Sequence, residues 1–173
     1  MRRLLDKIYF AAGVVAGLCL VMMALLILAQ IVGRWFGVVI PSTEDFSGFL
    51  LAAASFLALA YTLRSGGHIR VNLLISHLQG VRRRFIEGTI LLLALILVGY
   101  AAWSVSLLVI ESYQFDELSQ GYIPVPLWIP QAPMAIGLLI LEIALLDELV
   151  LLLRGEQPQY MQHDDVSLTG GGE

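Results

Sequence analysis

The feature that most constrains this chain is a run of apolar residues near its start. No charged residue occurs between Ile8 and Gly33, and the run is longer than the ~20 residues that a helix needs to cross a hydrocarbon core. Only 14% of the whole chain is charged, whereas soluble domains carry about 25% charged residues. The sequence therefore predicts a membrane protein. The run is too long for a signal peptide and lacks a following small-residue cleavage site, so we expect it to stay in the mature protein.

Three further apolar segments predict three more spans. Residues 46–63 and 88–110 carry no charge. The fourth segment is less regular, because prolines crowd its start and acidic residues lie near its end. Proline fits the first turn of a helix and breaks it elsewhere, so we expect this helix to begin near Trp128. The predicted fold class is an all-α membrane protein with four transmembrane helices in one domain over residues 1–154, with spans at about 8–33, 46–63, 88–110 and 128–153.

The distribution of basic residues predicts which ends of the spans face the cytoplasm. Lysine and arginine concentrate in cytoplasmic loops. Of the ten lysine and arginine residues, all but Arg34 flank the side that holds both termini and the connection between the second and third spans. The opposite side is acidic, with Glu44, Asp45, Glu111, Asp116 and Glu117. We therefore expect both termini in the cytoplasm.

The connection between the second and third spans predicts a helix on the membrane surface. Apolar residues recur there at intervals of three to five positions, from Ile69 to Phe85, which is typical of an amphipathic helix. A basic amphipathic helix lies in the interface. We expect residues 68–85 to form a cytoplasmic interfacial helix on which Arg82, Arg83 and Arg84 contact lipid headgroups. Residues 155–173 are polar and rich in glycine, so we expect a disordered tail.

Residue types suited to catalysis or cofactor binding are sparse. The chain has one cysteine, Cys19, and its three histidines all lie outside the predicted spans, although a haem between helices would need histidines within them. His68 and His77 are too far apart to be ligands on one helical face. We therefore expect no enzyme activity, no cofactor and no metal site, and we expect no nucleic-acid partner.

Three segments along the four-span chain resemble a known family. The first is GRWFGVVIPSTEDFSGFLL, in which an arginine ends the first span and an acidic pair opens the second. The second is AYTLRSGGHIRVNLL and the third is IPVPLWIPQAPMAIG. They are similar to segments of the small membrane subunit of tripartite ATP-independent periplasmic (TRAP) transporters, the DctQ type. One departure is Asn72, where an aspartate is commoner.

This resemblance implies a bacterial inner-membrane subunit without catalytic residues of its own. In such systems a soluble periplasmic protein captures the substrate, usually an organic acid, and a large multi-span permease subunit carries it inward with sodium. The small subunit would act as a scaffold for the large one and help to dock the periplasmic protein, so both are expected partners, together with membrane lipids. Two alternatives stay open: a self-contained homo-oligomeric transporter that uses Glu142, and a membrane-anchored enzyme or haem protein.

Charged residues near the spans are the candidates for structural and partner contacts. Arg34 could contact lipid headgroups, pair with Glu44 or Asp45, or bind the large subunit. Glu142 lies roughly 21 Å along its helix from Trp128, and an ionisable group at that depth in a membrane indicates a functional role. The full set of expected contact residues is Arg34, Glu44, Asp45, Arg64, His68, Arg70 and Glu142.

The acidic side of the protein carries two further expectations. Glu44 and Asp45 open a helix, where negative charge is favoured and where Ser42 or Thr43 can cap. The loop that precedes the fourth span mixes carboxylates with aromatic residues, a composition that suits protein docking. We expect contact with the periplasmic protein through Asp116, Glu117 and Trp128.

Overall fold

The computed structural model describes residues 2–64 and 81–154, with side chains over residues 5–63 and 85–153. This part of the chain forms four helices: α1 (Arg2–Trp35), α2 (Thr43–Arg64), α4 (Val81–Gln114) and α5 (Trp128–Arg154). They make two helical hairpins, α1 with α2 and α4 with α5. Within the described residues, β structure is limited to one isolated bridge between Leu118 and Pro126. The predicted all-helical class is therefore confirmed for the described residues.

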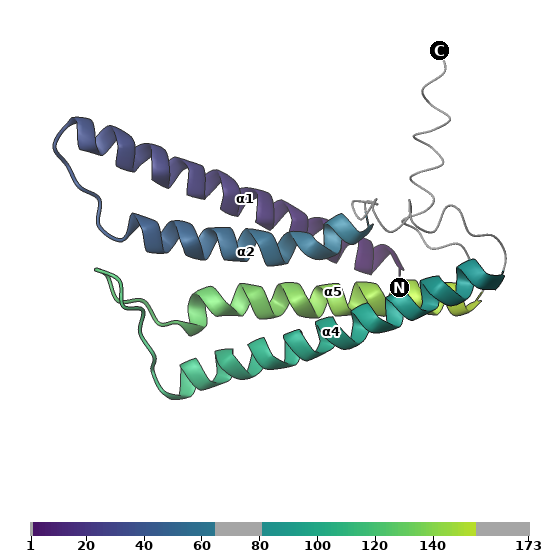
Figure 1. The fold of residues 1–173 in the computed structure, drawn as a ribbon. Coiled ribbons are helices and arrows are strands. Elements are labelled where there is room, and N and C mark those ends of the chain that lie inside the picture. Colours follow the sequence, from purple (N-terminus) through teal and green to yellow (C-terminus); the bar gives the residue numbers. More distant parts are fainter. Residues whose placement is uncertain (1, 65–80, 155–173) are drawn as a thin grey trace, which may run out of the picture.

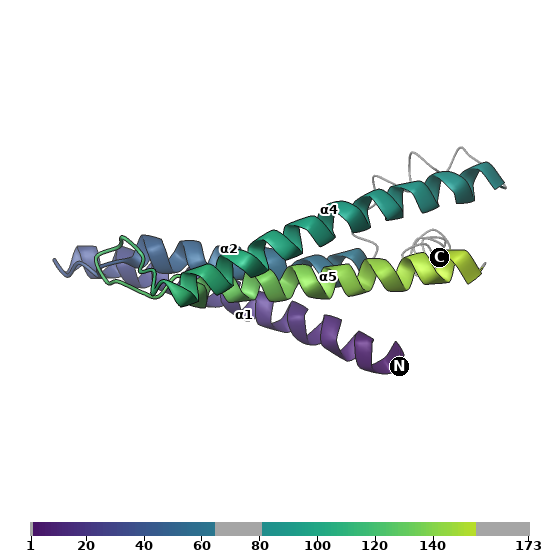
Figure 2. The ribbon, with the colours of Figure 1, turned by 90° about the horizontal axis from the view of Figure 1, so that it is seen from below.

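The four helices lie in a row rather than in a closed bundle. Contacts join α1 to α2, α2 to α5 and α5 to α4, so α2 and α5 are the central pair and α1 and α4 are the edges (Figure 1). A view from below shows α1 and α4 diverging from the central pair toward one end (Figure 2). We call this the termini end, because it holds Arg2 and Arg154. The opposite end, with the connections 36–42 and 115–127, is the loop end.

A glycine ends α1 at the loop end. Gly37 has a φ of 73°, a left-handed backbone conformation that glycine adopts without steric cost. The N–H of Val38 donates to the carbonyl of Gly33 at 2.8 Å, and the N–H of Gly37 donates to that of Arg34 at 3.2 Å. Together these bonds make a Schellman motif. The last carbonyls of α1 are thereby paired, and the chain turns back toward α2.

Small residues let the central pair approach closely. A Cβ placed on Gly137 of α5 would lie 2.5 Å from the carbonyl carbon and oxygen of Phe56 on α2, so only glycine fits there without a shift of the backbone. Ala53 and Ala54, less than one turn before Phe56, are buried. Small residues at helix contacts are the usual means by which membrane helices bring their backbones together.

Toward the termini end, one core cluster draws on all four helices. Tyr9 of α1 and Ala60 of α2 are almost fully buried. They pack with Leu91 of α4 and with Leu141 and Leu145 of α5. This cluster therefore joins all four helices into one unit.

Among the residues that the structure describes, three helices are long and apolar enough to cross a membrane: Leu5–Trp35 of α1, Thr43–Leu63 of α2 and Phe85–Gln114 of α4. They coincide with the first three predicted spans but are longer, because a helical backbone continues through the flanks where the apolar pattern stops. α5 begins at Trp128, as predicted. It is not one of the three, so its crossing of the membrane stays a prediction.

Two predicted segments fall largely outside the described residues. Of the interfacial helix expected at 68–85, residues 68–80 are not described, and residues 81–85 belong to the start of α4. The interfacial helix stays a prediction. The tail expected at 155–173 also lies outside the described residues.

Candidate functional site

The connection 115–127 at the loop end folds into a short hairpin. Leu118 and Pro126 pair in an antiparallel bridge, and the hydroxyl of Ser119 accepts a hydrogen bond from the N–H of Val125 at 3.0 Å. Two backbone hydrogen bonds also cross the turn, from Leu127 to Glu117 at 2.9 Å and from Ser119 to Val125 at 2.8 Å. This segment, which we call the 115–127 hairpin, is therefore held by its own hydrogen bonds rather than only by its neighbours.

The 115–127 hairpin is attached to the start of α2. The N–H of Ile123 donates to the hydroxyl oxygen of Ser42 at 2.9 Å, a contact between residues 81 positions apart. The carboxylate of Asp45 lies so close to Gly121 that a Cβ there would collide with it. These two contacts join the two helical hairpins at the loop end.

The start of α2 departs from the predicted capping arrangement. The carbonyl of Ser42 accepts the first helical hydrogen bond, from the N–H of Phe46 at 3.1 Å. Its hydroxyl is used by Ile123 instead, and the hydroxyl of Thr43 donates to the carbonyl of Ile40 at 3.0 Å. Among the described residues, both hydroxyls are bonded to the neighbouring connections, and neither makes a capping hydrogen bond to an N–H group of the first turn.

The three predicted docking residues have different surroundings. Asp116 is exposed, with a φ of 48°. Glu117 is exposed as well, but its Oε2 accepts a hydrogen bond from the buried hydroxyl of Ser112 at 2.8 Å. Trp128 packs edge to face against Tyr113, with 5.8 Å between ring centroids. Glu117 and Trp128 thus help to hold the ends of α4 and α5, and their contact with a partner stays a prediction.

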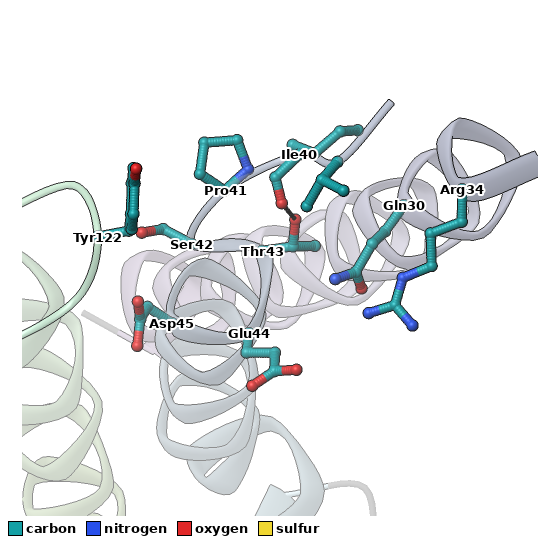
Figure 3. Close-up of a pocket in the computed structure, with 10 residues that line it drawn as sticks. Gln30, Arg34, Ile40, Pro41, Ser42, Thr43, Glu44, Asp45 and Tyr122 are labelled. Carbon is teal, nitrogen blue, oxygen red and sulfur yellow. Dashed lines mark hydrogen bonds between the residues drawn. The ribbon is translucent and has the colours of Figure 1, made fainter. Parts of the chain in front are cut away.

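An open cavity of about 590 Å³ lies between the end of α1 and the start of α2. Gln30 and Arg34 line it from α1, and Glu44 and Asp45 line it from α2 (Figure 3). Among the residues whose side chains are described, no ion pair joins Arg34 to either carboxylate. The pairing considered from the sequence is therefore not formed. A guanidinium and a carboxylate instead face the same space without neutralising each other.

Glu142 lies in the contact between α5 and α4. A Cβ on Gly99 of α4 would sit 3.1 Å from Oε1 of Glu142, so the missing side chain of Gly99 makes room for the carboxyl group. The Oε2 atom of Glu142 is buried and has no hydrogen-bond partner among the described residues. Leaving a buried polar atom unpaired is costly. The burial of Oε2 therefore lowers the stability of the fold, and no hydrogen bond from a described residue offsets this cost.

The remaining predicted contact residues cannot be placed in detail. The side chains of Arg64, Arg82, Arg83 and Arg84 lie outside the described range, and His68 and Arg70 lie outside it entirely. Their roles stay predictions. Within the described residues, no group of three or more His, Cys, Asp or Glu side chains is placed to hold a metal ion.

Sequence reasoning missed the glycines that shape these contacts. Gly99 and Gly137 interrupt apolar helices, where glycine costs about 1 kcal/mol relative to alanine. A glycine inside such a helix indicates a packing reason, so this signal was available. No local signal links Ser42 to Ile123, because that contact depends on how the two hairpins meet.

A family described as "Tripartite ATP-independent periplasmic transporters, DctQ component" matches residues 23–155, which run from the middle of α1 to the end of α5. Searches of curated proteins and of solved structures return no match. The chain belongs to the DctQ family, as the three segments of sequence predicted. Its class is accordingly the small permease subunit of a TRAP transporter.

Proposed function

We propose that this chain is the non-catalytic scaffold subunit of a sodium-coupled TRAP-type importer of organic acids or related small solutes. It lies in the bacterial inner membrane with both termini in the cytoplasm. It binds the large permease subunit along its helices and helps to dock the periplasmic substrate-binding protein at the loop end. Membership of the DctQ family supports this role.

The observation that carries the proposal is the bare apolar face of α4. Leu97, Tyr100 and Trp103 are 61%, 74% and 66% exposed. Tyr100 and Trp103 lie near the middle of the span Phe85–Gln114, whereas aromatic residues that face lipid concentrate at the two interfaces. Aromatic residues are also enriched where proteins meet. A large membrane partner that covers this face accounts for their position.

The loop end supports the docking role. Phe115 and Tyr122 are 74% and 88% exposed on the 115–127 hairpin, beside the exposed carboxylate of Asp116. Exposed aromatic residues are common at the centres of protein interfaces. Because the hairpin is held by its own hydrogen bonds, little ordering is needed when a partner binds.

Co-purification tests the scaffold role. The chain, tagged at its C-terminus and extracted from native membranes in mild detergent, is expected to elute with a stoichiometric, larger multi-span protein. Replacing both Tyr100→Leu and Trp103→Leu should reduce that recovery several-fold. Trp35→Leu, which removes an exposed aromatic residue at the loop end, is the matched control and should leave recovery unchanged. Elution of the chain alone, or only with further copies of itself, contradicts the proposal.

The alternative of a self-contained transporter rests on Glu142, whose Oε2 has no partner among the described residues. Glu142→Gln keeps the shape of the side chain and removes its charge. In proteoliposomes that contain the chain and its co-purifying subunits, the scaffold role predicts that sodium-driven uptake persists after this change. Uptake by the chain alone that is abolished by Glu142→Gln would establish the alternative instead.

A further inference from the structure

The cavity between α1 and α2 offers two opposite charges to one ligand. Arg34 and Glu44 line the same open space of about 590 Å³ without forming an ion pair (Figure 3). A guanidinium binds phosphate oxygens through two parallel hydrogen bonds, and a carboxylate accepts hydrogen bonds from an ammonium. A ligand that carries a phosphate and a primary ammonium a few bonds apart would satisfy both side chains at once.

The position of the cavity indicates where such a ligand comes from. Trp35, which follows Arg34, is 80% exposed, and the Tyr113–Trp128 ring pair lies at the same end of the helices. Tryptophan and tyrosine concentrate at the membrane–water interface, at the level of the headgroups. The cavity therefore opens at the depth where phospholipid headgroups lie.

Below the cavity, α1 presents groups in the order in which a glycerophospholipid presents its own. Arg34, Gln30 and Ile27 follow one another on one helical face, and each helical turn lies about 5 Å deeper. Gln30 lines the cavity, and its amide can donate to an ester carbonyl. Ile27 is 39% exposed and lies where the acyl chains begin.

On α2, the corresponding face is open. Glu44, Gly48 and Leu51 share that face by helical spacing. A Cβ placed on Gly48 would have nothing within 4 Å, and Leu51 is 50% exposed. Beneath the charged cavity there is thus apolar surface with a side chain missing, which leaves room for an acyl chain.

The geometry points to a binding site for one zwitterionic glycerophospholipid of the phosphatidylethanolamine type. Its phosphate binds Arg34, its ammonium binds Glu44 and one acyl chain lies beside Gly48. An anionic lipid fits less well, because Asp45 also lines the cavity and the carboxylates outnumber the guanidinium. A choline headgroup fits less well too, because its methylated nitrogen has no N–H to donate. This inference does not depend on the scaffold role.

Lipid binding by native mass spectrometry tests the headgroup assignment. The purified full chain, with any co-purifying subunit, is titrated with phosphatidylethanolamine, phosphatidylcholine and phosphatidylglycerol of matched acyl chains. Charge-assisted hydrogen bonds are worth enough that Arg34→Gln and Glu44→Gln should each weaken phosphatidylethanolamine binding about tenfold. Lys7→Gln, which removes a positive charge at the termini end of α1, should change nothing. Equal binding of the three lipids, or equal effects of all three substitutions, overturns the proposal, as does a preference for phosphatidylglycerol.

Two further variants test the occupant of the apolar surface. Gly48→Leu fills the open space without altering any charge, and leucine is a better helix former than glycine, so the chain should fold while phosphatidylethanolamine binding falls. A photo-crosslinking residue at Ile27, in the complex extracted from membranes, should give an adduct with the mass of a lipid. Unchanged binding in Gly48→Leu, or a crosslink from Ile27 to the large subunit, would show that a lipid is not the occupant.

Discussion

The central pair and the edge helices use apolar residues in opposite ways. α2 and α5 meet through small residues, with Gly137 against the backbone of Phe56. α4 instead turns Leu97 and Trp103 outward. In an apolar stretch of 18 residues, 22% of the residues of α2 are buried, compared with 6% of the residues of α4. Each hairpin therefore contributes one helix to the inner contact and one to the outside.

This difference follows from the physics of helices in lipid. Lipid tails are as apolar as leucine, so the hydrophobic effect does not drive membrane helices together. Close backbone approach, which requires small residues, does so through van der Waals contact. Large side chains on α1 and α4 are consequently free for recognition of lipid or protein. Stability and partner binding should then respond to different substitutions.

The largest effect is expected at the closest point of the central pair. Gly137→Ala places a Cβ where the backbone of Phe56 cannot move aside, so α2 and α5 must separate, at a cost of about 3 kcal/mol in unfolding free energy. Gly17→Ala is the matched control, because a Cβ there meets nothing within 4 Å and alanine favours the helix. Unfolding in a denaturing detergent titration compares the two. Equal stability would mean that the central pair is not in close contact.

A smaller effect is expected where the two hairpins join at the loop end. Gly121→Ala pushes against the carboxylate of Asp45, a flexible group that can swing away, so we expect a loss of about 1 kcal/mol in unfolding free energy. Combining it with Asp45→Ala should remove most of that loss, because the colliding group is gone. A double-mutant cycle measures this coupling, and additive effects would rule out the contact.

The smallest effect on stability is expected at the edge. Leu97→Ala on α4 removes a side chain that is 61% exposed, so unfolding free energy should change by no more than about 0.5 kcal/mol. Leu145→Ala in the core cluster, where the side chain is 4% exposed, should cost about 3 kcal/mol. Recovery of the large subunit should show the reverse order of sensitivity. A large loss of stability in Leu97→Ala would mean that this outward face of α4 packs within its own chain.

Much of the fold follows from local pattern. Charge-free runs identify the first three membrane helices, and the prolines before Pro133 place the start of α5 at Trp128, as observed. The helix bounds are less well predicted, because an apolar run measures membrane depth whereas a helix ends at a backbone signal. Gly37 is such a signal. Because it lies beyond the apolar run, α1 continues past Gly33 and ends at Trp35.

The candidate sites were only partly predictable, because they depend on how the two hairpins pack. Arg34 and Glu44 are identifiable as unusual charges, yet their shared cavity requires the turn at Gly37 and the register of α1 on α2. The contact of Ser42 with Ile123 joins residues 81 positions apart, and no periodicity reports it. Glu142 was singled out by its depth in an apolar segment, while its accommodation by Gly99 depends on the pairing of α4 and α5.

The unequal lengths of α1 and α2 affect the bilayer itself. The charge-free run of α1, Ile8–Gly33, contains 26 residues and that of α2, 46–63, contains 18, which correspond to roughly 39 and 27 Å of helix. The hydrocarbon core is about 30 Å thick, so α2 matches it and α1 exceeds it. A helix that is too long must tilt or thicken the membrane around it, and α1 does lean away from its neighbour (Figure 2). We therefore expect α1 to tilt or to thicken the lipid on its flank of the subunit, whereas α2 needs neither adjustment.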